Sequence, residues 1–198
     1  MLNLKAGSEP SFASTNIDIL HVNLRAFVPH SAELLARLTL LNFPAPVAIN
    51  EALLSKSVPC ISLPKYDLVS RLDCRDGREG GGIALFVRSS FSKCVVLVKQ
   101  SEIHKRLWII VLTNHGPLLV GVWYRPLCAG ETCSIATLES EWMDWKDQCI
   151  GTVIVGIVNV HHLAWLRHSS QTSAERRSLF QFCSSFGFIE CCKEPTRQ

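Results

Sequence analysis

Residues 153–162 constrain the fold of this chain more than any other segment. They begin with a run of mostly β-branched residues, which favours a buried strand, and Gly156 allows the backbone to bend where that strand ends. Three polar residues follow: Asn159, His161 and His162. Ligands of α/β folds bind at the carboxyl ends of strands. The segment therefore predicts a core strand that leads into a functional site.

Other apolar runs predict further strands. We expect them over residues 17–23, 47–50, 66–71, 83–88, 94–99, 106–113 and 118–124, with a last short strand over residues 188–192. The sequence Asn-His-Gly-Pro at residues 114–117 joins two of these runs and predicts an antiparallel hairpin.

Three segments have the residue spacing of helices. Ser31 is expected to be the N-cap of the first helix. The second helix is expected over residues 131–149, and the third over residues 174–186. Hairpins combined with helical crossovers predict an α/β (α+β) fold in which two sheets pack face to face with helices outside.

The composition is that of a globular domain. Of the 198 residues, 47% are hydrophobic and 19% are charged, which argues against a disordered chain. The formal net charge of +3 is too small to indicate nucleic-acid binding by itself. We expect residues 1–15 to be a disordered lead-in and residues 16–198 to form one domain.

The sequence also predicts an intracellular protein. No segment has the ~20 apolar residues of a membrane span. Residues 1–12 lack the apolar run of a signal peptide. The nine cysteines are odd in number and none has C-x-x-C spacing, so a disulfide framework is not expected. We therefore expect a nuclear or cytoplasmic protein that is not secreted.

Six short motifs occur in order along residues 17–197. They are Ile-Leu-His-Val-Asn (19–23), Ala-Ile-Asn-Glu (48–51), the glycine run that opens residues 80–88, Tyr-Arg-Pro (124–126), the strand from residue 153, and Glu-Pro-Thr-Arg (194–197). Each motif is weak alone, but the ordered set resembles the endonuclease/exonuclease/phosphatase superfamily, which includes AP endonuclease and deoxyribonuclease-I-like proteins. Within it, the set is most similar to the endonuclease domain of a non-LTR retrotransposon.

The resemblance implies a four-layered sandwich of two mixed β-sheets flanked by helices, and Mg²⁺-dependent hydrolysis of phosphodiesters in DNA. It makes Glu51 the metal ligand, which suits a hard cation. It gives Asn23, Tyr124 and Asn159 catalytic roles in orienting the metal ligand, the phosphate or the attacking water. The alternatives are a solvated loop residue at Glu51, turns at the two asparagines and a core-edge aromatic at Tyr124.

Two further contacts with nucleic acid follow from the same motifs. Arg125 could contact the DNA backbone, or it could be a solvated charge at the rim. Asn23, Glu51, Tyr124 and Asn159 are expected to converge on one cleft at the strand ends. His161 and His162 point in opposite directions on an extended chain, so one of them, taken as His162, lines this cleft while the other packs.

Two departures from the family pattern predict impaired hydrolysis. Ile157 occupies the position of the Asp that orients or deprotonates the nucleophilic water, and parity directs it into the cleft rather than into the main core. The family's Ser-Asp-His segment does not occur in the sequence, so the C-terminal strands are expected to be missing.

Three functions remain open at this point: an active nuclease, a non-catalytic nucleic-acid-binding remnant, and an unrelated α/β interaction module. A retroelement origin would add a reverse transcriptase, encoded downstream in the parent element, as a partner.

Overall fold

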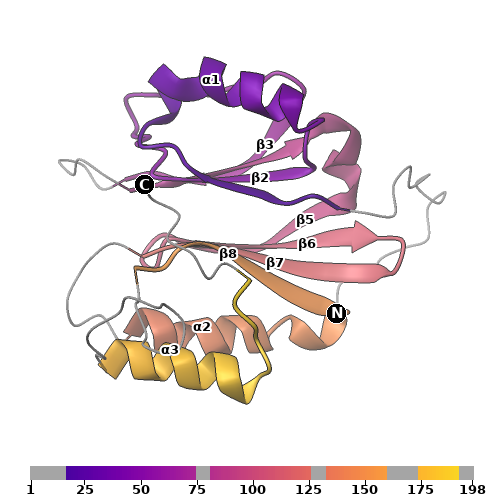
Figure 1. Ribbon diagram of the computed structural model, residues 1–198. Coiled ribbons are helices and arrows are strands. Elements are labelled where there is room, and N and C mark those ends of the chain that lie inside the picture. The colour runs from indigo at the N-terminus through magenta and orange to yellow at the C-terminus, as the bar shows by residue number, and fades with distance from the viewer. Residues whose placement is uncertain (1–16, 75–80, 126–132, 160–173, 192–198) are drawn as a thin grey trace.

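The computed structural model describes residues 17–74, 81–125, 133–159 and 174–191. Figure 1 shows four layers: one helix, two β-sheets packed face to face, and a second layer of helices. The elements in chain order are β1 (Leu20–Asn23), α1 (Phe27–Leu40), β2 (Pro46–Asn50), β3 (Tyr66–Leu72), β4 (Ile83–Arg88), η1 (Ser89–Cys94), β5 (Val95–Ser101), β6 (Arg106–Thr113), β7 (Gly116–Tyr124), α2 (Cys133–Met143), η2 (Lys146–Gln148), β8 (Gly151–Ile157) and α3 (Ala174–Ser185). The predicted sandwich is confirmed.

None of the helices described is both long and apolar enough to cross a membrane.

Each sheet is mixed, with its parallel pair at one edge. The first sheet has the strand order β1-β2-β4-β3, in which β1 and β2 are parallel. The second has the order β5-β6-β7-β8, in which β7 and β8 are parallel and β6 and β7 form the predicted hairpin. The two parallel pairs lie opposite each other, because β8 contacts both β1 and β2.

The hydrophobic core has three parts, one for each contact between neighbouring layers. Strand β6 contributes to two of them. Its residues Leu107, Ile109 and Val111 face the first sheet, while Trp108 and Ile110 face α2 and α3. A strand that is buried on both faces needs a continuous apolar run instead of alternation, which is how this segment reads in the sequence.

A buried ion pair fastens α2 to the second sheet. Arg106 is fully buried and donates to Oε2 of Glu141 (2.6 Å), to the backbone oxygen of Ser134 (2.7 Å) and to the hydroxyl of Thr137 (2.9 Å). The same carboxylate oxygen accepts a hydrogen bond from Nε1 of Trp108 at 2.8 Å. Burial acts to raise the pKa of Glu141, but the hydrogen bond and charge of Arg106 outweigh it and the pKa is lowered.

Helix α1 begins at Phe27, not at the predicted N-cap Ser31. Ser31 lies inside the helix, where its hydroxyl donates to the backbone oxygen of Val28 at 3.1 Å. The earlier start is possible because the Phe27 N–H donates to the backbone oxygen of Ala52 (2.8 Å). Pro29 in the first turn has no N–H that needs a partner.

The second predicted helix is shorter than expected. Helix α2 ends at Met143, and the short turn η2 follows. The Ile150 N–H then donates to the backbone oxygen of Pro117 at 2.8 Å, which brings the chain to the start of β8. This hydrogen bond to β7, which is distant in the sequence, draws the chain away from the helix. The local sequence did not indicate the contact.

The predicted strand over residues 188–192 is wrong for the part that the structure describes, residues 188–191. This segment terminates α3 instead. Gly187 has a φ of 71°, and the Phe188 N–H donates to the backbone oxygen of Cys183 at 2.8 Å. These are the features of a Schellman cap. The Phe188 ring then packs against Trp142 at 5.5 Å.

Candidate active site

The carboxyl ends of the two parallel strand pairs meet at one end of the sandwich. Strands β1 and β2 end in register at Asn23 and Asn50, and β7 and β8 end in register at Tyr124 and Ile157. The Asn50 side chain joins the two sheets there, because its Nδ2 donates a 2.9 Å hydrogen bond to the backbone oxygen of Trp123. These four strand ends and the loops that follow them are called the strand-end site below.

Three polar side chains line the inner face of the first sheet at this end. Asn23 shares a face with its register partner Asn50, which reaches across the sandwich, and His21 is in register with the core residue Ala48. Nε2 of His21 and Oδ1 of both asparagines are buried and have no hydrogen-bond partner among the residues that the structure describes. Burial also lowers the pKa of His21 below its ordinary value. The motifs indicated Asn23 as a site residue but not His21 or Asn50. The alternation of side chains along β1 could have indicated His21, which lies two residues before Asn23, and the pairing of β1 with β2 could have indicated Asn50.

Glu51 follows β2 directly and has a left-handed backbone, with φ of 53°. The loop after it is held by two glycines. The Ala52 N–H donates to the backbone oxygen of Gly82 at 3.4 Å, and the Leu53 N–H donates to that of Gly81 at 3.1 Å. The conformation of the loop that begins at Glu51 therefore depends on the glycine segment before β4.

Tyr124 lies beside the same glycines. It is 8% exposed and belongs to the core between the sheets. A Cβ added to Gly81 would lie 3.3 Å from Cε1 of Tyr124, and Gly81 has a φ of 115°. Both Gly81 and Gly82 are buried, so this part of the glycine run packs into the structure beside Tyr124.

Ile157 is in register with Tyr124 and packs against the core between the sheets, as Val155 does. The Ile157 side chain points toward the inner face, as the alternation of side chains along the strand predicted. The expectation that it takes no part in the main core is wrong. An apolar row of β8 therefore faces the sheet that carries His21, Asn23 and Asn50.

Asn159 and Arg125 are linked through the backbone. Nδ2 of Asn159 donates to the backbone oxygen of Arg125 at 2.6 Å, and the Arg125 N–H donates to that of Ile157 at 2.8 Å. The Arg125 side chain is 5% exposed, and its Nη2 lies 3.9 Å from Oε1 of Glu175 in α3. A buried and paired guanidinium gives the expected contact with DNA no support.

Other residues of the motifs lie outside the described part of the chain. They are Gly80, Pro126, Val160, His161, the predicted nucleic-acid contact His162, and residues 194–197. The structure brings together Asn23, Glu51, Tyr124 and Asn159 at the ends of β1, β2, β7 and β8.

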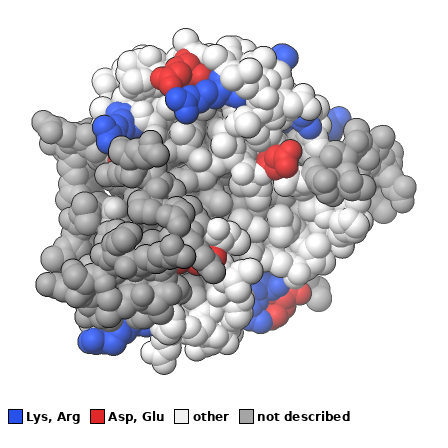
Figure 2. Space-filling model, in the orientation of Figure 1, with Lys and Arg blue, Asp and Glu red and all other residues white. Residues whose placement is uncertain are grey.

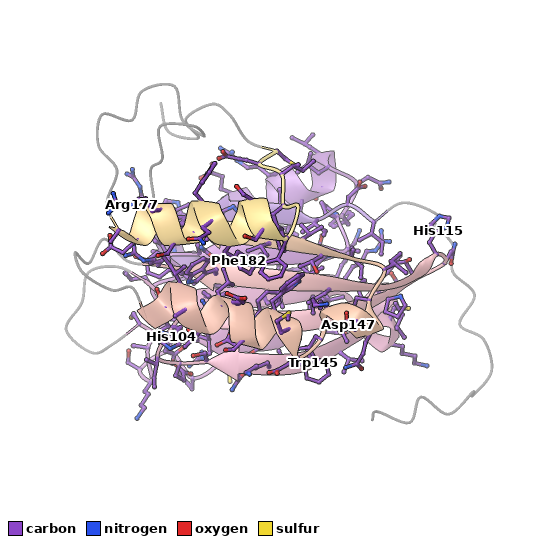
Figure 3. The ribbon with its side chains drawn as sticks, turned by 90° about the horizontal axis from the view of Figure 1, so that it is seen from below. His104, His115, Trp145, Asp147, Arg177 and Phe182 are labelled. Atoms are coloured by element: carbon purple, nitrogen blue, oxygen red, sulfur yellow. The ribbon has the colours of Figure 1, made fainter. Side chains whose placement is uncertain are left out.

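Backbone strain is concentrated at this end of the molecule. Of the eight non-glycine residues with positive φ in the described ranges, five lie here: Arg25, Glu51, Leu53, Lys105 and Asn159. Figure 3 shows the ends of the sandwich, with His104, just before β6, at one end and His115, in the β6–β7 turn, at the other. Left-handed non-glycine residues cost about 1–3 kcal/mol each and cluster at functional sites.

Comparisons with solved structures identify the fold. The endonuclease domain of TRAS1, a telomere-specific non-LTR retrotransposon, is 14% identical, with a TM-score of 0.59 over 87% of this chain and 71% of that one. The AP endonuclease LMAP from Leishmania major is 12% identical, with a TM-score of 0.65 over 85% and 66%. A 3′ phosphatase from Neisseria, NExo, bound to a product DNA hairpin, is 15% identical, with a TM-score of 0.56 over 84% and 71%.

The chain has the endonuclease/exonuclease/phosphatase fold. No protein-family model matches its sequence, and no curated protein does. The resemblance inferred from six short motifs is thus confirmed at the level of the fold, where overall sequence similarity is low.

The side chains at the strand-end site of this endonuclease/exonuclease/phosphatase fold suit a hard cation. Glu51 supplies a carboxylate, and the amide oxygens of Asn23 and Asn50, which have no partner among the described residues, lie on the adjoining inner face. Oxygen ligands of this kind fit Mg²⁺, which commonly keeps several of its waters. Among the described residues, no group of three or more His, Cys, Asp and Glu side chains is arranged to hold a metal.

Proposed function

We propose that this chain is a DNA-binding domain of endonuclease type in which Mg²⁺-dependent phosphodiester hydrolysis is impaired. The proposal rests chiefly on one observation, the register of Tyr124 with Ile157 at the strand-end site. An isoleucine packs on the inner face at the position where the family resemblance implies an Asp. Asn23, Glu51, Tyr124 and Asn159 are the residues that the resemblance implies at the other strand ends, while the family's Ser-Asp-His segment does not occur in the sequence.

The remaining residues would bind rather than activate. Glu51 would hold Mg²⁺ together with water, and the bound ion would neutralise charge on a phosphate. Asn23 would orient Glu51, while Tyr124 and Asn159 would hold phosphate oxygens. Ile157 can neither accept a proton nor orient a water, and the loss of a general base commonly costs about 10²–10⁴-fold in rate.

DNA is the proposed substrate class because of the structures with the same fold. The Neisseria phosphatase is bound to a product DNA hairpin, and TRAS1 is a telomere-specific retrotransposon. If this chain derives from such an element, a downstream reverse transcriptase is a proposed partner and a nuclear or cytoplasmic location follows. The fold gives no support to an unrelated α/β interaction module.

A nicking assay on supercoiled plasmid tests the proposal. The wild-type chain with Mg²⁺ should nick no faster than Glu51→Gln, while both bind a DNA duplex in EDTA. Robust nicking by the wild-type chain that Glu51→Gln abolishes would contradict impaired hydrolysis and favour an active nuclease. Absence of any salt-dependent binding to DNA would contradict the binding function itself.

A further inference from the structure

Positively charged side chains at the strand-end site fall into two groups. Seven of those that the structure describes lie at this end: Arg25, Lys56, Arg71, Lys105, Arg106, Arg125 and Arg177. Four are paired with carboxylates, at 3.0, 2.8, 2.6 and 3.9 Å: Arg71 with Asp73, Lys105 with Glu102, Arg106 with Glu141, and Arg125 with Glu175. Each of these pairs cancels its own charge.

The other three, Arg25, Lys56 and Arg177, are exposed and make no ion pair or hydrogen bond with the residues described. On the face in Figure 2, lysine and arginine side chains lie in small groups, several beside acidic ones, and form no broad basic patch. Among the described residues, the positive charge available to a partner at this end therefore comes from individual unpaired side chains.

Backbone contacts locate two of these cations on either side of Glu51. Arg25 lies between Leu24 and Phe27, whose N–H groups donate to the backbone oxygens of Asn50 (3.1 Å) and Ala52 (2.8 Å). Arg25 also has a left-handed backbone, with φ of 57°.

Lys56 lies in the loop on the other side of Glu51. Arg71, near the end of β3, holds this loop through a 2.7 Å hydrogen bond from its Nη1 to the backbone oxygen of Val58. Arg177 comes from the helix layer, where Figure 3 shows it at the same end as His104.

We infer that Arg25, Lys56 and Arg177 are the residues that bind the phosphates of a DNA backbone at the strand-end site, and that Arg125 is not. This inference rests on the proposed binding of DNA. A guanidinium or ammonium that is already paired and buried gains little from a phosphate, because it must first leave its carboxylate. An exposed, unpaired cation releases a counterion from the DNA at no such cost.

Salt dependence of binding tests the inference. In EDTA, a fluorescein-labelled DNA duplex is titrated by anisotropy at several salt concentrations between about 50 and 200 mM. Each of Arg25→Gln, Lys56→Gln and Arg177→Gln should lower the magnitude of the slope of log K against log[salt] by about 0.9, and the triple variant by about 2.7. Glutamine keeps a long polar side chain and removes only the charge.

A matched triple variant controls for net charge. Arg37, Lys65 and Lys93 are exposed and lie toward the opposite end of the sandwich, and their replacement by glutamine should leave the slope at the wild-type value. Equal unfolding midpoints would establish that all variants are folded. A wild-type slope in the first triple variant, or an equal loss in the control, overturns the inference while DNA binding stands. A wild-type chain that does not bind the duplex overturns the proposed function as well.

Discussion

At the scale of single residues, the strand-end site has polar groups on one sheet that face apolar groups on the other. Nε2 of His21 and Oδ1 of Asn23 and Asn50 are buried without a hydrogen-bond partner in the described part of the chain, and the facing strand offers Val155 and Ile157. A buried polar group without a partner costs about 1–3 kcal/mol. The site therefore places polar residues of one sheet opposite an apolar row of the other.

Ile157→Asp is expected to destabilise the fold without restoring nicking. A carboxylate would replace apolar packing against the core beside Tyr124, so the loss should exceed that of Ile157→Val by about 1–3 kcal/mol. Urea unfolding measures the first effect and plasmid nicking the second. Gain of Mg²⁺-dependent nicking by Ile157→Asp alone would contradict this expectation, since it would mean that only one group is missing.

His21 should make stability depend on pH. Its pKa is below the ordinary value of 6.5 when folded, so the unfolded chain takes up a proton that the folded chain resists. Stability should be complete above pH 6.5 and be lost as the pH falls through 6.5 toward the lowered pKa. Melting temperatures at a series of pH values should show this loss for the wild type and for His115→Gln, but not for His21→Gln. His115 is exposed and serves as the control; an unchanged pH profile in His21→Gln would refute the assignment.

At the scale of elements, Gly156 fixes β8 against β7. It has a φ of 145°, and a Cβ there would lie 1.8 Å from the backbone oxygen of Trp123. Gly156→Ala must displace the strand and should cost at least about 3 kcal/mol. Gly151→Ala in the same strand meets only a Leu118 side-chain carbon at 3.7 Å and should change stability by about 0.5 kcal/mol or less. Equal unfolding midpoints for the two variants would contradict this difference.

The packing of α2 on the second sheet depends on Glu141. Glu141→Gln leaves the fully buried Arg106 without a counter-charge and should cost about 3–5 kcal/mol in urea unfolding. Asp144→Asn breaks an exposed pair with Lys99, whose nitrogen lies 2.8 Å from the carboxylate, and should cost about 0–1 kcal/mol. If both variants lose the same small amount, the buried pair is not what holds the helix.

At the scale of the whole molecule, the fold brings residues far apart in the sequence to one end of the sandwich. A cation bound there should stabilise the folded state by mass action. At about ten times its Kd, Mg²⁺ should add about 1.4 kcal/mol, visible as a rise in melting temperature. Glu51→Gln should remove that rise while Glu139→Gln, an exposed change on α2, keeps it. An equal rise in all three chains would exclude Glu51 as the ligand, without any reference to activity.

The sequence alone determined most of the elements and their order. Apolar runs such as β6 and β8 read as strands because burial on both faces requires them to be apolar along their length. It also indicated that Asn23, Glu51, Tyr124 and Asn159 meet, because each lies at or just after the end of such a run. Two local predictions were wrong. Ser31 is not an N-cap, because the Ala52 carbonyl accepts from the Phe27 N–H and lets the helix start earlier. Residues 188–191 form no strand, because they belong to the Schellman cap of α3.

Only the tertiary structure decided which of these groups face a partner and which face water. Arg125 reads as a contact for DNA, yet Glu175 of a distant helix pairs with it. Ile157 packs against the core because Tyr124 and the opposite sheet close over it, and Asn50 and Nε2 of His21 are buried for the same reason. Local sequence sets the direction of a side chain along its own strand, whereas its surroundings come from the layer packed against it, which is remote in the chain.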